Sequence, residues 1–543
     1  MLPDQPDAGS DRPSALQRRT VLGLLAAAGA GTALGISAAP RAAASTSGTS
    51  TGPFAYKIQN NSGGVRQTIL GLGFEIQSDH IGAVNNQMDP NDPVISGVPH
   101  DLVASERTRF YQQILMAGRS DHGFRYCRLA QGLWLRGVSA DRKQIIGRWP
   151  TQMAELAEMQ TQAKLDGLAA TYFTPAPYWK STGSLMNGTL ACFDPSFTTT
   201  HPEYNADTAR FLNDFGDAVV RDLQYLENNG LPVRFWGLQN EPGNWNRAYG
   251  SCGYTGDTYR QTFDAVAPKV RAAFPGVTIH VDSRDGQSGA FGTAVRGDST
   301  ALRYVDAWTH HYTSQPSDNL ISAPSYYLDN TLGRPVFNDE FEWEGSTTGN
   351  YQQTVDTAHS IMNWMVFANA PTWFWLHALK PTYTDTAVGY GLGVWRPSDD
   401  SDYTKYAGVK QGYWDYNAPV WNAVSGFVQY LPWNSVRYQV DEPLDPATGK
   451  PYVDRRIMAW KTPQGKLVLA LTHRVPNAST ATAAPYTFTV DTGSSRTFTG
   501  HRYRWSPHDQ PLADNNVPQA TRSGPGLSIT LDPNTIEFWI ENI

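Results

Sequence analysis

The chain has 543 residues, of which 40% are hydrophobic and 12% aromatic, so it can bury a large core and form more than one domain. Its formal net charge is −7, and no cluster of Lys and Arg is interleaved with aromatic residues, which argues against nucleic acid as a partner. The 17 Trp and 26 Tyr indicate a core rich in aromatic residues, with some rings available to stack on flat ligands.

Residues 1–44 have the pattern of an export signal. Arg18 and Arg19 precede an apolar stretch at residues 21–36 that is short for a membrane span, and three alanines at residues 42–44 form a small-residue cleavage site. The paired arginines are typical of twin-arginine signals, and an ordinary secretory signal is the alternative. Residues 45–54 have the composition of a linker. We therefore predict a secreted protein, not attached to a membrane once the signal is removed.

Between residues 67 and 380, short apolar strands alternate with helices or long connections. Apolar residues at helical spacing predict helices at residues 99–117, 151–166, 208–229, 257–274 and 354–368. The predicted strands span residues 67–77, 124–130, 168–173, 233–241, 277–281, 304–308, 334–341 and 372–377. This alternation predicts an α/β fold, a closed (β/α)8 TIM barrel over residues 67–431. The number of barrel strands could differ from eight by one. A doubly wound sheet is the other alternative, although its glycine-rich fingerprint is missing.

The pattern changes after a last helix at residues 418–431. Short strands separated by turn residues follow at residues 436–440, 456–460, 466–471, 486–490, 497–503, 527–531 and 536–540. They predict an antiparallel β-sandwich side domain over residues 432–543. The N-terminal segment 55–66 contains a further strand, outside the barrel count, that could join this domain.

An apolar strand that begins near Phe235 stops at a carboxylate, Glu241. Pro242 follows, and because proline has no N–H to donate, strand pairing ends there. Glu241 is therefore expected at the carboxyl end of a strand, the end of a barrel that carries reactive groups. A surface turn with an incidental acid is the alternative.

A second carboxylate stretch lies at residues 335–344. Because side chains alternate along a strand, Asn338, Glu340 and Glu342 are expected on one face. An acid that points into a barrel is costly to bury unless it is paired or used. We predict Glu340 as the inward acid at the strand end, with Glu342 as the alternative.

Two carboxylates that face each other across a pocket can cleave a glycosidic bond. The Asn240-Glu241-Pro242 strand end and Glu340, 340 − 241 = 99 residues later, resemble the retaining clan A glycoside hydrolases, whose catalytic glutamates end strands 4 and 7 of a barrel. Residues 174–180 and 310–312 are similar to motifs of family 30. Residues 73–79 and 337–343 differ from that family's motifs and more faintly resemble agarase-type sequences.

The resemblance implies cleavage of a β-linked polysaccharide or oligosaccharide by double displacement, without a cofactor or metal. Glu241 would be the acid/base and Glu340 the nucleophile. Asn240 would bind the sugar 2-hydroxyl, and Arg128 would keep the nucleophile ionised, a structural ion pair being the alternative for Arg128. The sugar, the linkage, endo or exo action and the oligomeric state stay open.

Further substrate contacts are expected from other strand ends and from aromatic residues. His310, His311 and Tyr312 follow the sixth strand, and one histidine is expected to orient Glu340. Glu75, at the end of the first strand, could line a subsite. Tryptophans are candidate sugar platforms, although each is more commonly a core residue; these are Trp179, Trp245, Trp308 and Trp375.

The three cysteines cannot all pair within one chain. Cys127 lies in an apolar run and is predicted to be a buried free thiol. Cys192 and Cys252 lie in loops after successive predicted strands, and we predict a disulfide between them, because export implies an oxidising destination.

Two rival functions are weaker. A metal-dependent hydrolase using His310 and His311 would lack the spacing of known zinc motifs. A barrel that binds carbohydrate with little or no catalysis would have no need of both Glu241 and Glu340.

Overall fold

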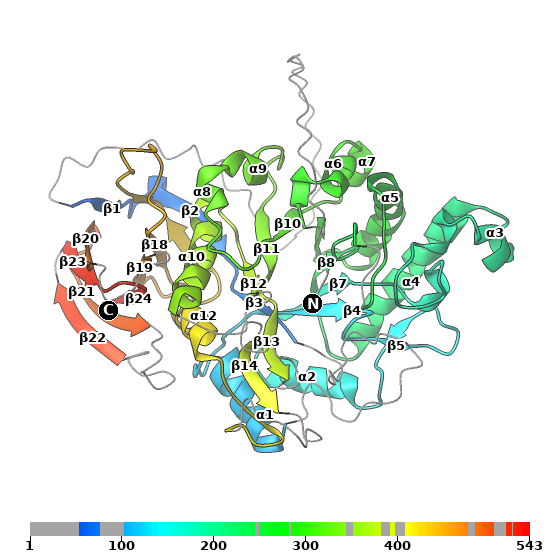
Figure 1. Cartoon of the computed structure of the whole chain (residues 1–543), viewed down its shortest axis with the longest axis horizontal. Helices are drawn as coiled ribbons and strands as arrows, with labels where there is room; N and C mark the ends of the chain where they lie inside the picture. Colours follow the sequence, from blue (N-terminus) through cyan, green and yellow to red (C-terminus); the bar gives the residue numbers. More distant parts are fainter. Residues whose placement is uncertain are drawn as a thin grey trace, which may run out of the picture.

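The computed structural model describes residues 54–76, 102–244, 249–281, 284–343, 351–381, 391–396, 408–475, 484–503, 517–523 and 525–542. A barrel and a β-sandwich lie side by side in this part of the chain (Figure 1). Helices α10 (Tyr351–Phe367) and α12 (Ala418–Tyr430) contact each other and pack against strands of the sandwich. The predicted export signal at residues 1–44 and most of the predicted linker lie outside the described residues.

The barrel is closed and all of its neighbouring strands are parallel, which confirms the predicted (β/α)8 fold. In chain order its strands are β3 (Gly73–Glu75), β4 (Tyr126–Gln131), β7 (Gly167–Tyr172), β8 (Val233–Gly237), β9 (Thr278–Val281), β10 (Ala307–His311), β11 (Val336–Phe341) and β12 (Trp373–Trp375). The connection between β9 and β10, which is weakly helical in sequence, forms the short helices α6 (Ala290–Arg296) and α7 (Ser299–Leu302). The count of eight strands therefore holds.

Amphipathic helices cover the outside of the barrel. Among them are α1 (Ala104–Phe110), α2 (Gln152–Gln162), α4 (Thr208–Asn228), α5 (Gly256–Ala273), α8 (Asn319–Ser322) and α9 (Pro324–Leu328). Helix α4 shows why these segments are helical. Its N-cap Asp207 accepts a hydrogen bond from the backbone N–H of Arg210 at 2.9 Å, and Phe211, Phe215 and Val219 recur at helical spacing on its buried face.

Residues 67–77 do not form the single barrel strand that the sequence predicts. Strand β2 (Val65–Ile69) pairs with β16 (Ser435–Tyr438) of the side domain, and only β3 enters the barrel. Gly71 lies between them with φ 139°, where a Cβ would lie 2.9 Å from both Arg125 and Trp433. The chain changes direction at a position that only glycine fits, so one apolar run supplies strands to two domains.

The eighth barrel strand ends earlier than predicted. The chain leaves β12 at Trp375 and forms β13 (His377–Pro381), which pairs with β14 (Gly391–Arg396) in a separate sheet completed by β15 (Tyr413–Tyr416). In β15, Trp414 packs edge-on against Phe110 of α1, with ring centroids 6.2 Å apart. This sheet is therefore attached to the barrel wall.

The side domain consists of two sheets. The smaller one has the order β17-β1-β20-β23 and the larger one β2-β16-β18-β19-β24-β21-β22. The strands not yet given are β1 (Tyr56–Ile58), β17 (Val440–Asp441), β18 (Arg455–Lys461), β19 (Leu467–His473), β20 (Tyr486–Asp491), β21 (Thr497–Tyr503), β22 (Val517–Ser523), β23 (Gly526–Leu531) and β24 (Thr535–Glu541). Strand β1 pairs antiparallel with β17 but parallel with β20, so the sandwich is not wholly antiparallel as predicted.

The barrel core extends into the side of the sandwich that faces the barrel, while residues of the two sheets form a separate core. Phe538 of β24 is fully buried against α12, with its ring centroid 5.0 Å from that of Phe427 and 5.4 Å from that of Tyr430. A Cβ on Gly426 would lie 2.2 Å from the Phe538 ring, so only glycine permits this approach of helix and strand. The apolar cluster that fills the barrel continues into the sandwich through these residues.

The cysteines form no disulfide. Cys127, Cys192 and Cys252 are all buried free thiols, as predicted for Cys127, but the predicted bridge between Cys192 and Cys252 is wrong. A bridge needs Cβ atoms about 3.5–4.5 Å apart with suitable directions, and the order of the loops alone does not ensure that geometry. Burial raises the pKa of both thiols and so disfavours the thiolate that disulfide formation requires.

None of the helices in the described part of the chain is both long enough and apolar enough to cross a membrane.

Replacing Phe538 by Ala is expected to leave a cavity at the domain interface and to lower the free energy of unfolding by about 3–5 kcal/mol. Because one apolar cluster spans the barrel and the adjoining side of the sandwich, we expect one cooperative transition at lower denaturant, measured by tryptophan fluorescence. Val453→Ala, at a side chain 44% exposed, is the control and should change the free energy by less than about 0.5 kcal/mol. Two separate transitions in the wild type would contradict this shared cluster.

Candidate active site

A cavity of about 860 Å³ opens at the carboxyl ends of the barrel strands. Its lining includes Glu75, Glu241, Glu340 and Glu342, together with His311. Glutamates that the sequence places far apart therefore meet at the same end of the barrel, as strand ends of a closed parallel barrel must.

Glu241 follows the end of β8 in a strained backbone conformation. Its φ of 40° is in the left-handed region, which non-glycine residues rarely adopt. Its carboxylate is held on both sides. Asn244 Nδ2 donates a short hydrogen bond to Oε2, and His311 Nδ1 lies 3.1 Å from Oε1. Strain that is kept in place by specific contacts is typical of functional positions.

Glu340 projects from β11 into the cavity. Its Oε2 accepts a hydrogen bond from Arg128 Nη1 at 2.7 Å, and its backbone N–H donates to Asn338 Oδ1 at 3.1 Å. Glu342, two residues further on, has a different partner, since its Oε2 lies 3.1 Å from His377 Nδ1. Of these two glutamates, Glu340 is the one beside Glu241.

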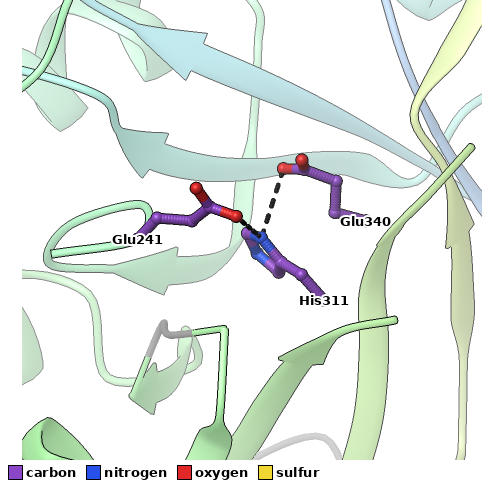
Figure 2. A group of neighbouring side chains, drawn as sticks. All are labelled: Glu241, His311 and Glu340. Carbon is purple, nitrogen blue, oxygen red and sulfur yellow. Dashed lines mark hydrogen bonds and ion pairs between the residues drawn. The ribbon is translucent and has the colours of Figure 1, made fainter. Parts of the chain in front are cut away.

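His311 lies between the two glutamates (Figure 2). One oxygen of Glu241, one oxygen of Glu340 and a ring nitrogen of His311 all lie within 4.8 Å of one another. His311 Nδ1 is 3.6 Å from Glu340 Oε2, and its Nε2 is 3.5 Å from Asp339 Oδ1. The imidazole thus fixes the spacing of the pair.

Arg128 of β4 connects several of these groups. Besides Glu340, its Nη1 donates to Glu75 Oε2 at 2.9 Å, and its Nη2 donates to Asn240 Oδ1 at 2.5 Å. The guanidinium is 1% exposed, and a buried cation requires anionic partners. The ion pair with Glu340 that the resemblance implied is therefore present, together with one to Glu75 that it did not imply.

Glu75 is a third carboxylate in the site and is fully buried. Trp134 Nε1 donates to its Oε1 at 2.7 Å, and Trp134 also lines the cavity. Burial raises the pKa of Glu75 to about 7, although Arg128 opposes the effect, while the charge of Glu340 adds to it. The sequence suggested Glu75 as a subsite residue but gave no reason to expect Trp134, which lies in a loop without a regular pattern.

The histidines His310 and His311 both line the cavity, but their surroundings differ. The His310 ring packs against Tyr327 and Trp364, its Nε2 is 3.3 Å from Gln287 Oε1, and burial lowers its pKa to about 3. The pair therefore does not form one metal site. Tyr312, the next residue, lines the cavity.

Three of the candidate tryptophans lie in the core. The buried indoles of Trp179, Trp308 and Trp375 donate to the backbone oxygens of Lys143, Thr331 and His377, at 2.9, 3.0 and 2.7 Å. They are core residues outside the cavity lining, which agrees with the commoner role given for each of them and not with that of a sugar platform. Trp245 lies outside the described residues. Aromatic lining comes instead from residues such as Trp134, Tyr249 and Tyr326.

Glu75 should make stability depend on pH. The folded protein keeps the proton up to about pH 7 and the unfolded chain releases it near 4.5, so the contribution of neutral Glu75 is complete below pH 4.5 and is lost as the pH rises through 7. The difference, 7 − 4.5 = 2.5, corresponds to at most about 3 kcal/mol. We expect denaturant unfolding to show this loss in the wild type but not in Glu75→Gln. Glu158→Gln on α2 is the control. If Glu75→Gln lost as much stability as the wild type when the pH rises, the pH dependence would come from other titratable groups.

Comparison with known proteins identifies the fold. No family model matches the chain, and no curated protein matches it either. Solved structures do match. The catalytic domain of the family 30 xylanase C from Talaromyces cellulolyticus has 14% identity and a TM-score of 0.61, with 90% of this chain and 100% of that chain covered. A conserved exported protein from Bacteroides fragilis has 11% identity and a TM-score of 0.63, with 90% and 100% covered.

A more distant match is the family 51 arabinofuranosidase from Xanthomonas axonopodis pv. citri, with 12% identity, a TM-score of 0.51, and 90% of this chain and 99% of that chain covered. At these identities the likeness concerns the fold, and a fold alone does not assign a function. The chain therefore has the barrel and side-domain fold that clan A glycoside hydrolases of family 30 also have.

Proposed function

We propose that the protein is a secreted retaining glycoside hydrolase that cleaves a β-linked polysaccharide or oligosaccharide. The observation that carries the proposal is the spacing of Glu241 and Glu340, which have carboxylate oxygens within 4.8 Å of each other at one end of the barrel. Retaining enzymes hold their two carboxyl groups about 5–5.5 Å apart, whereas inverting enzymes need about 6.5–9.5 Å to admit a water molecule. The spacing favours double displacement.

In the first step Glu241 donates its proton to the leaving glycosidic oxygen while Glu340 Oε attacks the anomeric carbon. The bond to the leaving group breaks, and a covalent glycosyl ester of Glu340 forms. In the second step Glu241, now a carboxylate, takes a proton from water as the water attacks the same carbon. The ester bond to Glu340 breaks, and the sugar is released with its original anomeric configuration.

The surroundings of the two acids support this division of roles. Arg128 places a positive charge 2.7 Å from Glu340, the acid proposed as the nucleophile. Glu241 is held by the side chains of Asn244 and His311. When Glu340 loses its charge in the ester, the electrostatic penalty on ionising Glu241 falls, so the same residue can act first as acid and then as base.

Substrate class and export are proposed on separate grounds. Proteins of the same fold include a xylanase and an endo-β-1,6-glucanase, and we take a β-linked glycan as the substrate class on that likeness. Export is proposed from Arg18, Arg19 and the apolar stretch that follows them.

Glu241→Gln and Glu340→Gln should each lower kcat on a cleaved glycan by about 10²–10⁴-fold, because each removes a proton-transfer or nucleophilic group while preserving shape. Hydrolysis of plant, algal and fungal glycans, followed by reducing-end assay and product sizing, measures the loss. Glu158→Gln is the matched control on the outer helix α2 and should retain the wild-type rate.

Two outcomes would contradict the proposal. Hydrolysis at the wild-type rate in both variants would refute the roles of Glu241 as acid/base and Glu340 as nucleophile. Binding of glycans without cleavage would fit the non-catalytic alternative. Proton NMR of the first product should show the β-anomer before mutarotation. An initial α-anomer would instead indicate inversion.

Chelation should leave the activity unchanged. Glu241, His311 and Glu340 have ligand atoms close enough to hold a divalent cation, so a metal-dependent hydrolase is the competing use of the same residues. Double displacement requires no metal. We expect glycan hydrolysis in excess EDTA to match that in buffer, and a loss that added zinc or manganese restores would favour the metal-dependent alternative.

A further inference from the structure

One end of the cavity is enclosed by buried charged residues that the catalytic scheme does not use. Glu342 follows β11, and His377 and Lys380 belong to β13; these three side chains, with Glu75 and Trp134, are called the walled end here. Glu342, His377 and Lys380 are 6%, 5% and 7% exposed, yet all line the cavity. Their side chains are thus shielded from bulk solvent but can contact a ligand in the cavity.

The charged groups of the walled end interact with one another. Glu342 Oε2 is 3.1 Å from His377 Nδ1, and the Lys380 ammonium is attracted to both Glu342 and Glu75. Lys380 Nζ lies 6.0 Å from the centroid of the Trp134 ring. Burying opposite charges is a poor way to add stability, because well-packed apolar residues would serve at least as well. Its position on a cavity wall indicates a polar ligand.

The wall itself is anchored to the barrel. Strand β13 pairs with β14, which pairs with β15, and β15 is held against α1 by Trp414. The guanidinium carbon of Arg109 lies 3.7 Å from the centroid of the Trp414 ring. Lys380 therefore projects from a sheet attached to the barrel, as a preorganised binding group should.

Barrel topology places the walled end on the side of the nucleophile. Glu342 is two residues from Glu340, and Glu75 shares Arg128 with it. In the ring of eight strands, β12 and β3 lie opposite β8 and β9. The walled end is thus across the barrel mouth from Glu241 and from the open rim, where Tyr326 is 44% exposed and donates to Asp285 at 3.1 Å.

This placement decides which part of a substrate meets the walled end. The sugar ring that Glu340 attacks must extend away from the leaving oxygen that Glu241 protonates. The ring on the nucleophile's side therefore points toward β12 and β3, and the leaving group toward β8 and β9.

The charge of the walled end decides what kind of sugar fits. Two carboxylates, Glu340 and Glu342, face two cations, Arg128 and Lys380, while Glu75 keeps its proton up to about pH 7. Burial holds the pKa of His377 well below its ordinary value, so this ring adds no positive charge at neutral pH. No positive charge is left over for a carboxylate or sulfate on the sugar, whereas hydroxyl groups can donate to Glu342 and accept from Lys380.

We propose that Glu342, His377 and Lys380 form the recognition site for the sugar ring bound on the nucleophile's side, and that this ring is uncharged. The inference rests on the proposed glycosidase function and adds to it the substrate class and the residues that select it. Neutral, hydroxyl-rich sugars are taken, and uronic acids and sulfated sugars are rejected.

The test uses 4-nitrophenyl β-glycosides, which place one defined sugar on the nucleophile's side and a chromogenic leaving group on the other. The panel is galactoside, glucoside, mannoside, xyloside, glucuronide and 6-sulfated galactoside. We expect the mature protein to cleave a neutral member with kcat/KM at least about tenfold above the charged members. Lys380→Met and Glu342→Gln should each lower kcat/KM for that substrate by about 10–100-fold, mainly through KM, because each removes a charge-assisted hydrogen bond.

Controls separate recognition from folding. Lys269→Met makes the same change at an outer ion pair with Asp217 on helices α5 and α4 and should leave kcat/KM unaltered. If Lys380→Met loses thermal stability because Glu342 is left buried without its cation, the double variant Lys380→Met/Glu342→Gln removes both charges. The double variant should regain the thermal stability of the wild type, but its KM should stay above the wild-type value.

Preference for the glucuronide or the sulfated galactoside would overturn the inference. So would single variants that lose thermal stability while keeping the wild-type KM, since a merely structural ion pair would behave in that way. Glu340→Gln is assayed in parallel. Loss of hydrolysis in Glu340→Gln, with no KM change in the Lys380 and Glu342 variants, would refute this recognition site and leave the glycosidase function standing. Full activity in Glu340→Gln would refute the function itself.

Discussion

The site depends on a single buried guanidinium. Arg128 lies in β4 and is 1% exposed. Its guanidinium donates hydrogen bonds to Glu75 of β3, Asn240 beyond β8 and Glu340 of β11. A buried cation is tolerated only if anions and hydrogen-bond acceptors surround it, and these acceptors can reach it only from the same end of a closed barrel. The arginine thus fixes the distance between strands that are far apart in sequence, and with it the position of Glu340 relative to Glu241.

Around this guanidinium the carboxylates have different surroundings, and the difference supports the roles proposed for them. Glu340 has a cation at 2.7 Å, whereas Glu241 is held by the amide of Asn244 and the imidazole of His311 on a strained backbone. Glu75 is buried deeply enough to retain a proton near neutral pH. Environments that separate the protonation states of neighbouring acids are what acid/base chemistry at one site requires.

The parts of the fold remote from the site hold its walls in place. Helix α12 is buried along nearly its whole length, and a helix that is apolar on all sides needs cover on all sides. The side domain supplies that cover through β24, and Phe538 joins the two cores. On the barrel side, the sheet of β13, β14 and β15 extends the eighth strand and carries His377 and Lys380 to the cavity. The side domain thereby completes the burial of a barrel helix.

Local pattern was enough for the sequence to specify the barrel, the side domain and the two strand ends that carry Glu241 and Glu340. Strand and helix periodicities are set by neighbouring residues, and Pro242 ends pairing whatever surrounds it. Tertiary structure alone decided the rest. Trp308 and Trp375 are core residues while Trp134 lines the cavity, and Cys192 and Cys252 stay unpaired. Lys380 is attracted to Glu342. Each outcome depends on how segments that sequence spacing does not relate come together. The division at Gly71 has the same cause, since only the approach of Arg125 and Trp433 shows why one apolar run serves two domains.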